Sequence, residues 1–323
     1  MKILVTGAAG FIGSHLAEHL AASGHAVAGI DCMLDNYALE LKELNASGLA
    51  KAGVAFSKLD LAAADLIPVL RDVEIVFHGA AQPGLAAATP FETFARNNIT
   101  ATHRLLDAAK RSDAIRAFVY LSTSSVYGAD ATGDEHSEPR PTSYYGVTKL
   151  AAEQLILAAA RDLGFPGCSM RLFSVYGPRE RPEKLYPRLI RAILEGKEFP
   201  LFEGSDRHLR SFTYVGDIVK GLAAVLSNPD RCAGEVFNLG SDTALSTGEG
   251  IRIVEKIIGK PARIALKPKR PGDQLRTHAN IGKARAMLGY NPETTAREGL
   301  AREVEWYQRE VVGKVDANIM EGR

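Results

Sequence analysis

Short apolar runs alternate with helical patterns along the first half of the chain, and this alternation constrains the fold more than any other feature. Runs such as KILVTG, AVAGID and EIVFHGAA stand near helical patterns such as FIGSHLAEHLAASG. Strands separated by helices indicate a parallel sheet that is covered on both faces, with right-handed crossovers. We therefore predict an α/β fold with a doubly wound, Rossmann-like parallel sheet.

The pattern changes after Gly177, where Pro, Gly and charged residues become frequent around a single helical stretch. This composition favours a smaller lobe built largely from loops. The later segment FTYVGDIVKGLAAVLSNP resembles an element that returns to the first lobe. We expect a nucleotide-binding unit over 1–175 with a returning segment near 212–228, an interleaved smaller lobe over 176–310, and a patternless, disordered tail over 311–323.

The charge balance excludes several classes of partner. Net charge is +1, and no basic run with interleaved aromatics suggests nucleic acid or an anionic membrane. Cys32, Cys168 and Cys232 lie far apart and match no metal-ligand spacing, which indicates reduced thiols and no metal. Without a signal-peptide pattern or an apolar stretch of ~20 residues, we expect a cytoplasmic protein.

Three glycines, Gly7, Gly10 and Gly13, lie between the first strand and the first helix. Glycine lets the backbone approach a pyrophosphate, and the helix N-terminus attracts anions. The next strand ends in Asp31, a carboxylate able to bind ribose hydroxyls and to repel a 2′-phosphate, which favours NAD over NADP. The glycines could instead serve only the turn, and Asp31 only a loop or cap. Asp60 could reach the adenine or cap a helix.

Tyr145 and Lys149 fall on one face of a helix that begins near Tyr144. An ammonium beside a phenol stabilises the phenolate, as does a positive nicotinamide ring, and together they could lower the phenol pKa towards neutrality and create a general base. The alternative is a spacing that arose by chance.

Nine motifs together resemble the extended short-chain dehydrogenase/reductases that act on nucleotide sugars. They run in order as TGAAGFIG, Asp31, HGAAQPG, NNITAT, STSSVYG, YYGVTK, RLFSVYGP, RSFTYVGDIV and RPGD. The resemblance covers residues 3 to about 290 and implies NAD as cofactor with Thr123, Tyr145 and Lys149 as the catalytic group. The further cofactor-binding residues that it implies are Gly7, Gly10, Phe11, Ile12, Gly13, Asp31, Asp60, Leu61, Ala80, Ala81 and Asn98.

The hydroxyl run, Ser122 to Ser125, narrows the reaction. Related 4,6-dehydratases carry an Asp-Glu pair at the two positions after Thr123, and UDP-xylose-forming decarboxylases carry Glu at the second. Here both are serine, Ser124 and Ser125, which argues against elimination and leaves oxidation and reduction at C4. Consecutive hydroxyls suit a substrate carboxylate. The alternative is that the serines only cap the end of the strand.

The substrate residues implied by the resemblance come from several segments. Ser174 could add a hydroxyl and Arg181 a charge, although Arg181 could also be a solvated loop residue. One motif departs from the family, since relatives commonly read Arg-Pro-Asp-Met where this chain has RPEK. The implied substrate-binding residues are Pro83, Thr123, Ser124, Ser125, Ser174, Arg181, Arg210 and Arg270 for sugar and diphosphate, and Asp273 near the ribose. Arg210 and Arg270 could instead be surface charges, His78 reads as a core histidine, and Tyr144 as a packing residue.

The motifs together look most like UDP-glucuronate 4-epimerases. The resemblance implies conversion of UDP-glucuronate to UDP-galacturonate through a transient 4-keto sugar, with NAD recycled. The alternatives are UDP-glucose 4-epimerase, another nucleotide-sugar oxidoreductase, or a non-catalytic NAD-binding regulator. We expect a homodimer paired through the segments TATHRLLDAAKR and KLAAEQLILAAARDL, the alternative being two well-buried helices of a monomer.

Overall fold

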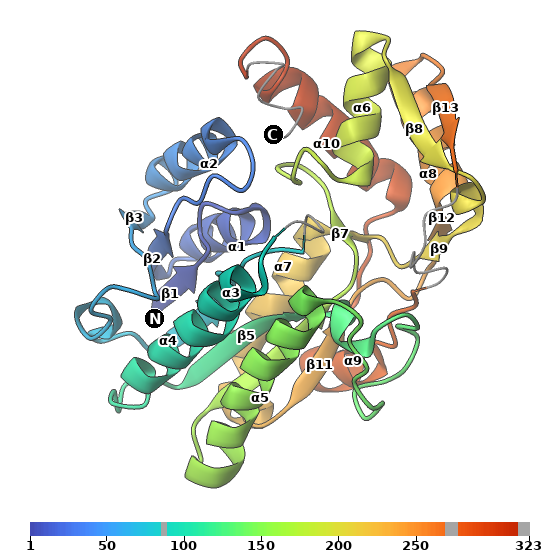
Figure 1. Ribbon diagram of the computed structural model, residues 1–323. Coiled ribbons are helices and arrows are strands. Elements are labelled where there is room, and N and C mark those ends of the chain that lie inside the picture. Colours follow the sequence, from blue (N-terminus) through green and yellow to red (C-terminus); the bar gives the residue numbers. More distant parts are fainter. Residues whose placement is uncertain (85–88, 269–276, 316–323) are drawn as a thin grey trace.

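The computed structural model describes residues 1–84, 89–268 and 277–315, and a seven-stranded sheet forms its centre (Figure 1). The strand order is β11-β6-β5-β4-β1-β2-β3, and every pairing in it is parallel. The strands are β1 Lys2–Thr6, β2 Ala26–Asp31, β3 Ala55–Lys58, β4 Ile75–His78, β5 Ala117–Thr123, β6 Gly167–Leu172 and β11 Val236–Leu239. The predicted doubly wound α/β fold is confirmed.

Helices cover both faces of the sheet and build two separate apolar cores. Within β1, Ile3 and Val5 face one core and Leu4 faces the other, as the alternation of a strand requires. The helices on the first face are α1 Phe11–Ala22 and α7 Val215–Ala223. Those on the second face are α4 Ala101–Ala109 and α5 Tyr144–Leu163. Before α4 come α3 Phe91–Phe94 and a π-helical turn, Ala95–Thr100.

One helix of the first half, α2 (Leu39–Lys51), is not visible in the sequence pattern. Its buried residues include Lys42 and Asn45, so an apolar stripe does not mark its inner face. The Lys42 ammonium donates to the Leu34 carbonyl at 2.5 Å. Leu41 joins the core of the smaller lobe, so α2 contacts both parts of the molecule.

The smaller lobe, at the upper right of Figure 1, has its own apolar core around α6, α8 and α10. Its elements are α6 Leu185–Glu195, β8 Glu198–Phe202, β9 Leu209–Arg210, β12 Leu245–Ser246, α8 Thr247–Ile258, β13 Arg263–Lys267 and α10 Ala296–Glu310. Ser246 and Thr295 each cap the helix that follows through a capping box. This lobe is the second part of the predicted fold.

Two segments from the second half return to the sheet. Helix α7 packs against α1, and β11 pairs with β6 at the edge. Helix α9 (Gly282–Leu288) contacts β11, and the short strands β7 (Val175–Tyr176) and β10 (Thr213–Tyr214) pair where the chain passes between the two parts. Residues 316–323 of the expected tail lie outside the described residues.

Candidate active site

The glycine turn brings backbone against backbone between β1 and α1. Gly7 has a φ of 72°, and a Cβ there would lie 2.8 Å from the amide nitrogen of Ala80. A Cβ on Gly13 would lie 2.2 Å from the carbonyl oxygen of Gly7, so no larger residue fits. Helix α1 follows Gly10, and no side chain caps it. The first turn of α1 holds the remaining predicted residues, Phe11, Ile12 and Gly13. An uncapped helix start beside close-packed glycines fits a pyrophosphate.

Asp31 lies at the end of β2, beside this turn. Its carboxylate accepts hydrogen bonds from the backbone amides of Ala9 at 3.2 Å and Met33 at 2.8 Å. The capping role is therefore present, and because each oxygen has a further lone pair, a ribose hydroxyl can still bind. Asn45, which sequence reasoning missed, donates to the Ala9 carbonyl at 2.9 Å and fixes the turn from α2.

Asp60 caps the turn after β3 by accepting from the Ala62 amide at 2.9 Å. Its other oxygen accepts from the Arg96 guanidinium at 2.6 Å. Leu61 is buried, and its carbonyl accepts from Arg104 at 3.2 Å. The capping alternative is thus realised, while contact with adenine stays a prediction.

The segment after β4 runs back past the glycine turn. The Ala80 amide donates to the Thr6 hydroxyl at 3.1 Å, which ties the end of β4 to the end of β1. Ala81 and Pro83 are partly exposed beyond it, as residues that face a ligand would be.

Asn98 joins this segment to α5. Its side-chain oxygen accepts from the Gln82 amide at 2.6 Å, and its nitrogen donates to the Thr148 hydroxyl at 2.9 Å. Asn98 lies in the π-helical turn, whose extra residue per turn is common at functional sites. Asn98 therefore links the segment after β4 to α5, and its contact with the cofactor stays a prediction.

The predicted catalytic residues converge from β5 and α5. Thr123 ends β5 and hydrogen-bonds Tyr145 in the first turn of α5. Lys149, one turn later, is buried and donates to the Leu121 carbonyl at 2.6 Å. Its ammonium also lies 4.1 Å from the ring centre of Tyr120. The fold therefore brings Thr123, Tyr145 and Lys149 together at the carboxyl end of β5.

Burial dominates the electrostatics of these residues. Burial raises the pKa of Tyr145, and only in second place do the hydrogen bond from Thr123 and the charge of Arg181 lower it. In the protein alone, desolvation outweighs these two groups; the expected fall towards neutrality, which includes the positive nicotinamide ring, stays a prediction. Burial also lowers the pKa of Lys149 to about 7, and the charge of Glu153 opposes that shift.

The hydroxyl run forms the start of a short helix at the end of β5. Thr123 accepts from the Ser125 amide at 3.1 Å and donates to the Ser125 hydroxyl at 3.2 Å, so it caps the short helix Ser124–Tyr127. The cap is thus made by Thr123 and belongs to a helix, and of the three serines only Ser125 takes part in it. Ser124 is nearly buried, and the buried Ser122 hydroxyl has no partner among the described residues. A carboxylate ligand stays a prediction.

Ser174 and Arg181 come from the segment that links the two parts. Ser174 has a φ of 26°, a region that non-glycine residues avoid and that often marks a functional site. Arg181 is only 15% exposed, lies 3.2 Å from Glu183 and acts on the pKa of Tyr145. It is therefore no solvated loop charge. Its position beside Tyr145 fits contact with a sugar.

The predicted residues for the nucleotide end are only partly covered. Arg210 ends β9 in the smaller lobe and is partly exposed. Arg270 and Asp273 lie outside the described residues.

The loop of residues 177–184 carries Arg181, which we expect to contact the sugar, and we call it the sugar loop. Two contacts that sequence reasoning missed anchor it to α1. The Nε2 atom of His15 lies 2.8 Å from the Pro178 carbonyl, and Arg179 pairs with Glu18 at 2.9 Å. Burial lowers the pKa of His15 to about 4, so the ring is neutral near pH 7. The helix that starts at the glycine turn therefore also holds the loop that carries Arg181.

Two readings of aromatic residues agree with the structure. His78 is buried between the hydroxyls of Thr6 and Thr102, at 2.7 and 2.8 Å, which confirms a satisfied core histidine. Tyr144 packs edge-on against Phe91 with ring centres 5.3 Å apart. Neither ring needs a chemical role.

The described ranges contain neither a cluster of metal ligands nor a membrane-spanning helix. In them, no group of three or more His, Cys, Asp or Glu side chains is arranged to hold a metal ion. None of the helices there is long and apolar enough to cross a membrane.

The candidate site lies where the winding of the sheet reverses. Strand β2, which follows α1 in the chain, pairs with one edge of β1, whereas β4 pairs with the other edge of β1. Ligands of open parallel sheets bind at the carboxyl ends of the strands at such a point. At these ends lie the glycine turn, Asp31, the segment after β4, and Thr123 with its neighbours Tyr145 and Lys149. The arrangement can hold a dinucleotide beside a phenol and a threonine.

The family model described as "NAD dependent epimerase/dehydratase family" matches residues 3–240 of the chain. YtcB of Bacillus subtilis, described as an uncharacterized UDP-glucose epimerase, is 41% identical over 94% of this chain and 97% of its own length. UDP-glucuronate 4-epimerase 2 of Arabidopsis thaliana is 34% identical over 95% of this chain and 76% of its own length.

A solved structure resembles the whole fold. The crystal structure of UDP-glucuronic acid 4-epimerase from Bacillus cereus, in complex with UDP-glucuronic acid and NAD, has a TM-score of 0.90 and 38% identity. The match covers 96% of this chain and 99% of the other. These similarities agree with the geometry of the site.

Proposed function

Since this chain belongs to the NAD dependent epimerase/dehydratase family, we propose that it epimerises a UDP-sugar at C4, with NAD as cofactor. The substrate is UDP-glucuronate and the product UDP-galacturonate, through a transient 4-keto sugar. The observation that carries the proposal is the convergence of Thr123, Tyr145 and Lys149 beside an acid-free hydroxyl run. UDP-glucuronate 4-epimerases among the relatives and solved structures support the substrate.

NAD fits the residues around the glycine turn. Bound there, it would accept and return the hydrogen at C4 of the sugar. The uncapped start of α1 would hold the pyrophosphate, and Asp31 the adenosine ribose. Solved relatives at 38% identity contain NAD.

The chain's own residues handle the proton and the sugar. Tyr145 takes the proton of the C4 hydroxyl and returns it, and Thr123 orients the same oxygen. Lys149 supplies positive charge near the phenol, which favours the phenolate. The two positions directly after Thr123 are Ser124 and Ser125. Neither is an acid that could protonate a leaving hydroxyl, so elimination lacks its general acid there.

The preference for an acidic sugar rests on the hydroxyl run and on Arg181. Ser124, Ser125 and Ser174 would hold the carboxylate by hydrogen bonds, and Arg181 would add charge. Fixing the carboxylate matters because a 4-keto glucuronate is a β-keto acid that readily loses CO₂. Pro83, Arg210, Arg270 and Asp273 complete the proposed substrate contacts.

UDP-glucose is the second candidate substrate. The description of YtcB as a UDP-glucose epimerase favours it. A purely regulatory NAD-binding protein is disfavoured, because the catalytic group is assembled.

Incubation of the protein and NAD with UDP-glucuronate, followed by proton NMR, tests the proposal. We expect UDP-galacturonate to accumulate to an equilibrium mixture, with UDP-glucose converted far more slowly. Tyr145→Phe is the control that should lower turnover at least about 100-fold. No conversion of UDP-glucuronate, or equal conversion of UDP-glucose, contradicts the assigned substrate.

We also propose a cytoplasmic homodimer paired through the segments TATHRLLDAAKR and KLAAEQLILAAARDL. The second segment lies in α5 and leaves Leu163 67% exposed. Sedimentation at micromolar concentration should give twice the monomer mass.

We further propose how the parts divide the work. Residues 1–175, with the returning segment near 212–228, bind NAD. Residues 176–310 form most of the nucleotide-sugar lobe.

A further inference from the structure

Glu153 continues the line of functional residues on α5. Tyr145, Lys149 and Glu153 are spaced by four residues, so they lie on one face of the helix. Glu153 is fully buried. A carboxylate in that position must be stabilised by partners, because an isolated buried charge is strongly disfavoured.

Arg171 on β6 supplies the main partner. Its Nη2 atom lies 2.6 Å from Oε1 of Glu153, and its Nε atom donates to Oε2 at 3.2 Å. Ser169 donates to the same Oε2 at 2.8 Å. Both carboxylate oxygens of Glu153 are thus hydrogen-bonded.

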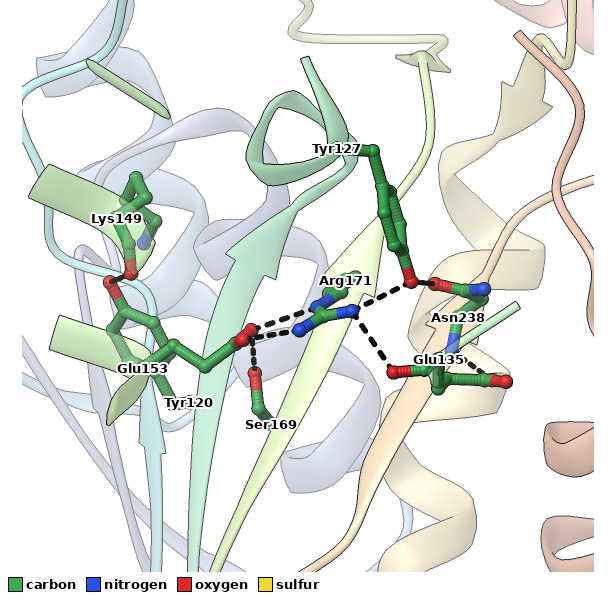
Figure 2. A network of polar contacts seen from close by, with 8 residues as sticks. All are labelled: Tyr120, Tyr127, Glu135, Lys149, Glu153, Ser169, Arg171 and Asn238. Atoms are coloured by element: carbon green, nitrogen blue, oxygen red, sulfur yellow. Dashed lines mark hydrogen bonds and ion pairs between the residues drawn. The ribbon is translucent and has the colours of Figure 1, made fainter. Parts of the chain in front are cut away.

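The network is fixed at its far end by Tyr127 and Glu135 and by Asn238 from β11 in the second half of the chain. Arg171 donates to the Tyr127 hydroxyl at 2.8 Å, and Tyr127 donates to Asn238 on β11 at 2.8 Å. The Asn238 amide donates to Glu135 at 2.7 Å. Figure 2 shows this line of contacts from Glu153 to Glu135, with Lys149 beyond the Glu153 end and joined through its carbonyl to the Tyr120 hydroxyl.

The direction of the ion pair matters for Lys149. Glu153 stands on the helix of Lys149, whereas Arg171 stands on β6 beyond the carboxylate, so the negative end of the pair is nearer to the ammonium (Figure 2). The other titratable groups around Lys149 are neutral: Tyr120 from β5 and Tyr145 from α5, both with raised pKa, and His78 from β4.

We propose that Glu153 is a positioning residue that acts through Lys149: it keeps the Lys149 ammonium protonated beside Tyr145, and Arg171 holds it in place for that task. The fold buries Lys149 and gives it a carbonyl and a ring face as direct contacts. Burial favours loss of its proton, and the Glu153 charge opposes that loss. The functional part of the inference rests on the proposed reaction.

The direct test is the titration of Lys149 in the NAD-bound protein. Lysine labelled with ¹³C at Cε gives one NMR signal per side chain, and Lys149→Ala identifies the one to follow. Glu153→Gln keeps the size and removes the charge, so we expect the Lys149 pKa to fall by about one unit or more. Ser169→Ala removes a hydrogen bond and keeps the charge, so the titration should match wild type.

A double variant covers the case in which Glu153→Gln fails to fold. Glu153→Met with Arg171→Met replaces the buried pair by apolar groups of similar size, a change that proteins often tolerate. It too should lower the Lys149 pKa. An unchanged Lys149 pKa in either folded variant, or the same fall in Ser169→Ala, overturns the inference.

The pH profile of turnover links the inference to the reaction. In Glu153→Gln, the alkaline limb of kcat/KM should move to lower pH by the same amount as the Lys149 titration. A lost rate without a moved limb would indicate a purely structural role. If wild type does not convert UDP-glucuronate, the proposed function fails, while the titration still decides whether Glu153 controls Lys149.

Discussion

Two parts of the molecule stabilise buried carboxylates in different ways. After the proposed function, we call the part around α5 and β6 the cofactor side, and the part around residues 177–184 and α10 the sugar side. On the cofactor side, Glu153 has hydrogen bonds to both oxygens from Arg171 and Ser169. On the sugar side, Oε2 of Glu180 and both carboxylate oxygens of Glu303 have no hydrogen bond of ordinary geometry among the described residues, and the two carboxyls contact each other. Glu180 lies in the sugar loop and Glu303 on α10.

This difference shows which side has its buried polar atoms hydrogen-bonded by the protein itself. A buried polar atom without a hydrogen bond costs about 1–3 kcal/mol, so the polar atoms on the sugar side need a proton or a ligand as a further partner. For Glu180 and Glu303 we expect a shared proton. Burial raises the pKa of both carboxyls, and the contact between them raises the pKa of Glu303 further while it lowers that of Glu180. For the buried Ser122 hydroxyl, which has no partner among the described residues, we expect a bound sugar to supply one.

Removing Arg171 should have the largest effect, because it would make the cofactor side resemble the sugar side. Arg171→Met leaves Glu153 buried without its charge partner, and we expect a loss of about 3–5 kcal/mol in the free energy of unfolding. Urea unfolding at pH 7 measures it. The double variant Glu153→Met/Arg171→Met should recover most of the loss. Equal stability of the single and double variants would show that the pair is not what satisfies Glu153.

The sugar side should lose selectivity when its hydroxyls are removed. Ser124→Ala with Ser174→Ala would delete two charge-assisted hydrogen bonds to the carboxylate, each worth roughly 1.5–3 kcal/mol. We expect kcat/KM for UDP-glucuronate to fall about a hundredfold while that for UDP-glucose changes little. The control is Ser205→Ala, whose hydroxyl is bonded to the Phe202 carbonyl away from the site. An unchanged ratio would make the hydroxyl run a strand cap only.

The shared proton of Glu180 and Glu303 should make stability depend on pH. Burial raises the pKa of Glu180 from 4.5 to about 8, and Lys184, Arg181 and Glu183 modify that shift. Between these values the folded state binds more protons than the unfolded state, so stability falls as pH rises through the window.

Glu180→Gln should remove much of this dependence, since the amide can donate to an ionised Glu303. From pH 5.5 to 8.5 we expect wild type to lose at least about 1.4 kcal/mol more than the variant, the equivalent of one pKa unit. The exposed Glu198→Gln is the control. Parallel pH curves for wild type and Glu180→Gln would refute the shared proton.

The contrast between the two sides also explains what the sequence could predict. The alternating pattern predicted the sheet, and local spacing predicted the glycine turn, Tyr145 and Lys149, because these residues act through short-range geometry. The contacts made by Arg171 and Glu303 join elements far apart in the chain. An Arg within the apolar strand GCSMRL signals a buried partner, but nothing in the pattern says that the partner is Glu153.

Helix α2 was missed for a related reason. Its inner face carries Lys42 and Asn45, which are satisfied by carbonyls of other segments, so no apolar period marks it. Sequence spacing likewise shows the cation near Tyr145 and not the depth of burial, which raises the pKa of Tyr145 in the protein alone.

The fate of a deuterium at C4 tests the central claim most directly, since that claim is epimerisation at C4 with NAD recycled. The protein is incubated with NAD and UDP-glucuronate deuterated at C4, and the product is read by NMR while absorbance follows NADH. The account predicts UDP-galacturonate that retains the deuterium at C4, with no NADH accumulating. Deuterium lost to solvent, or NADH accumulating in proportion to the sugar consumed, would contradict it.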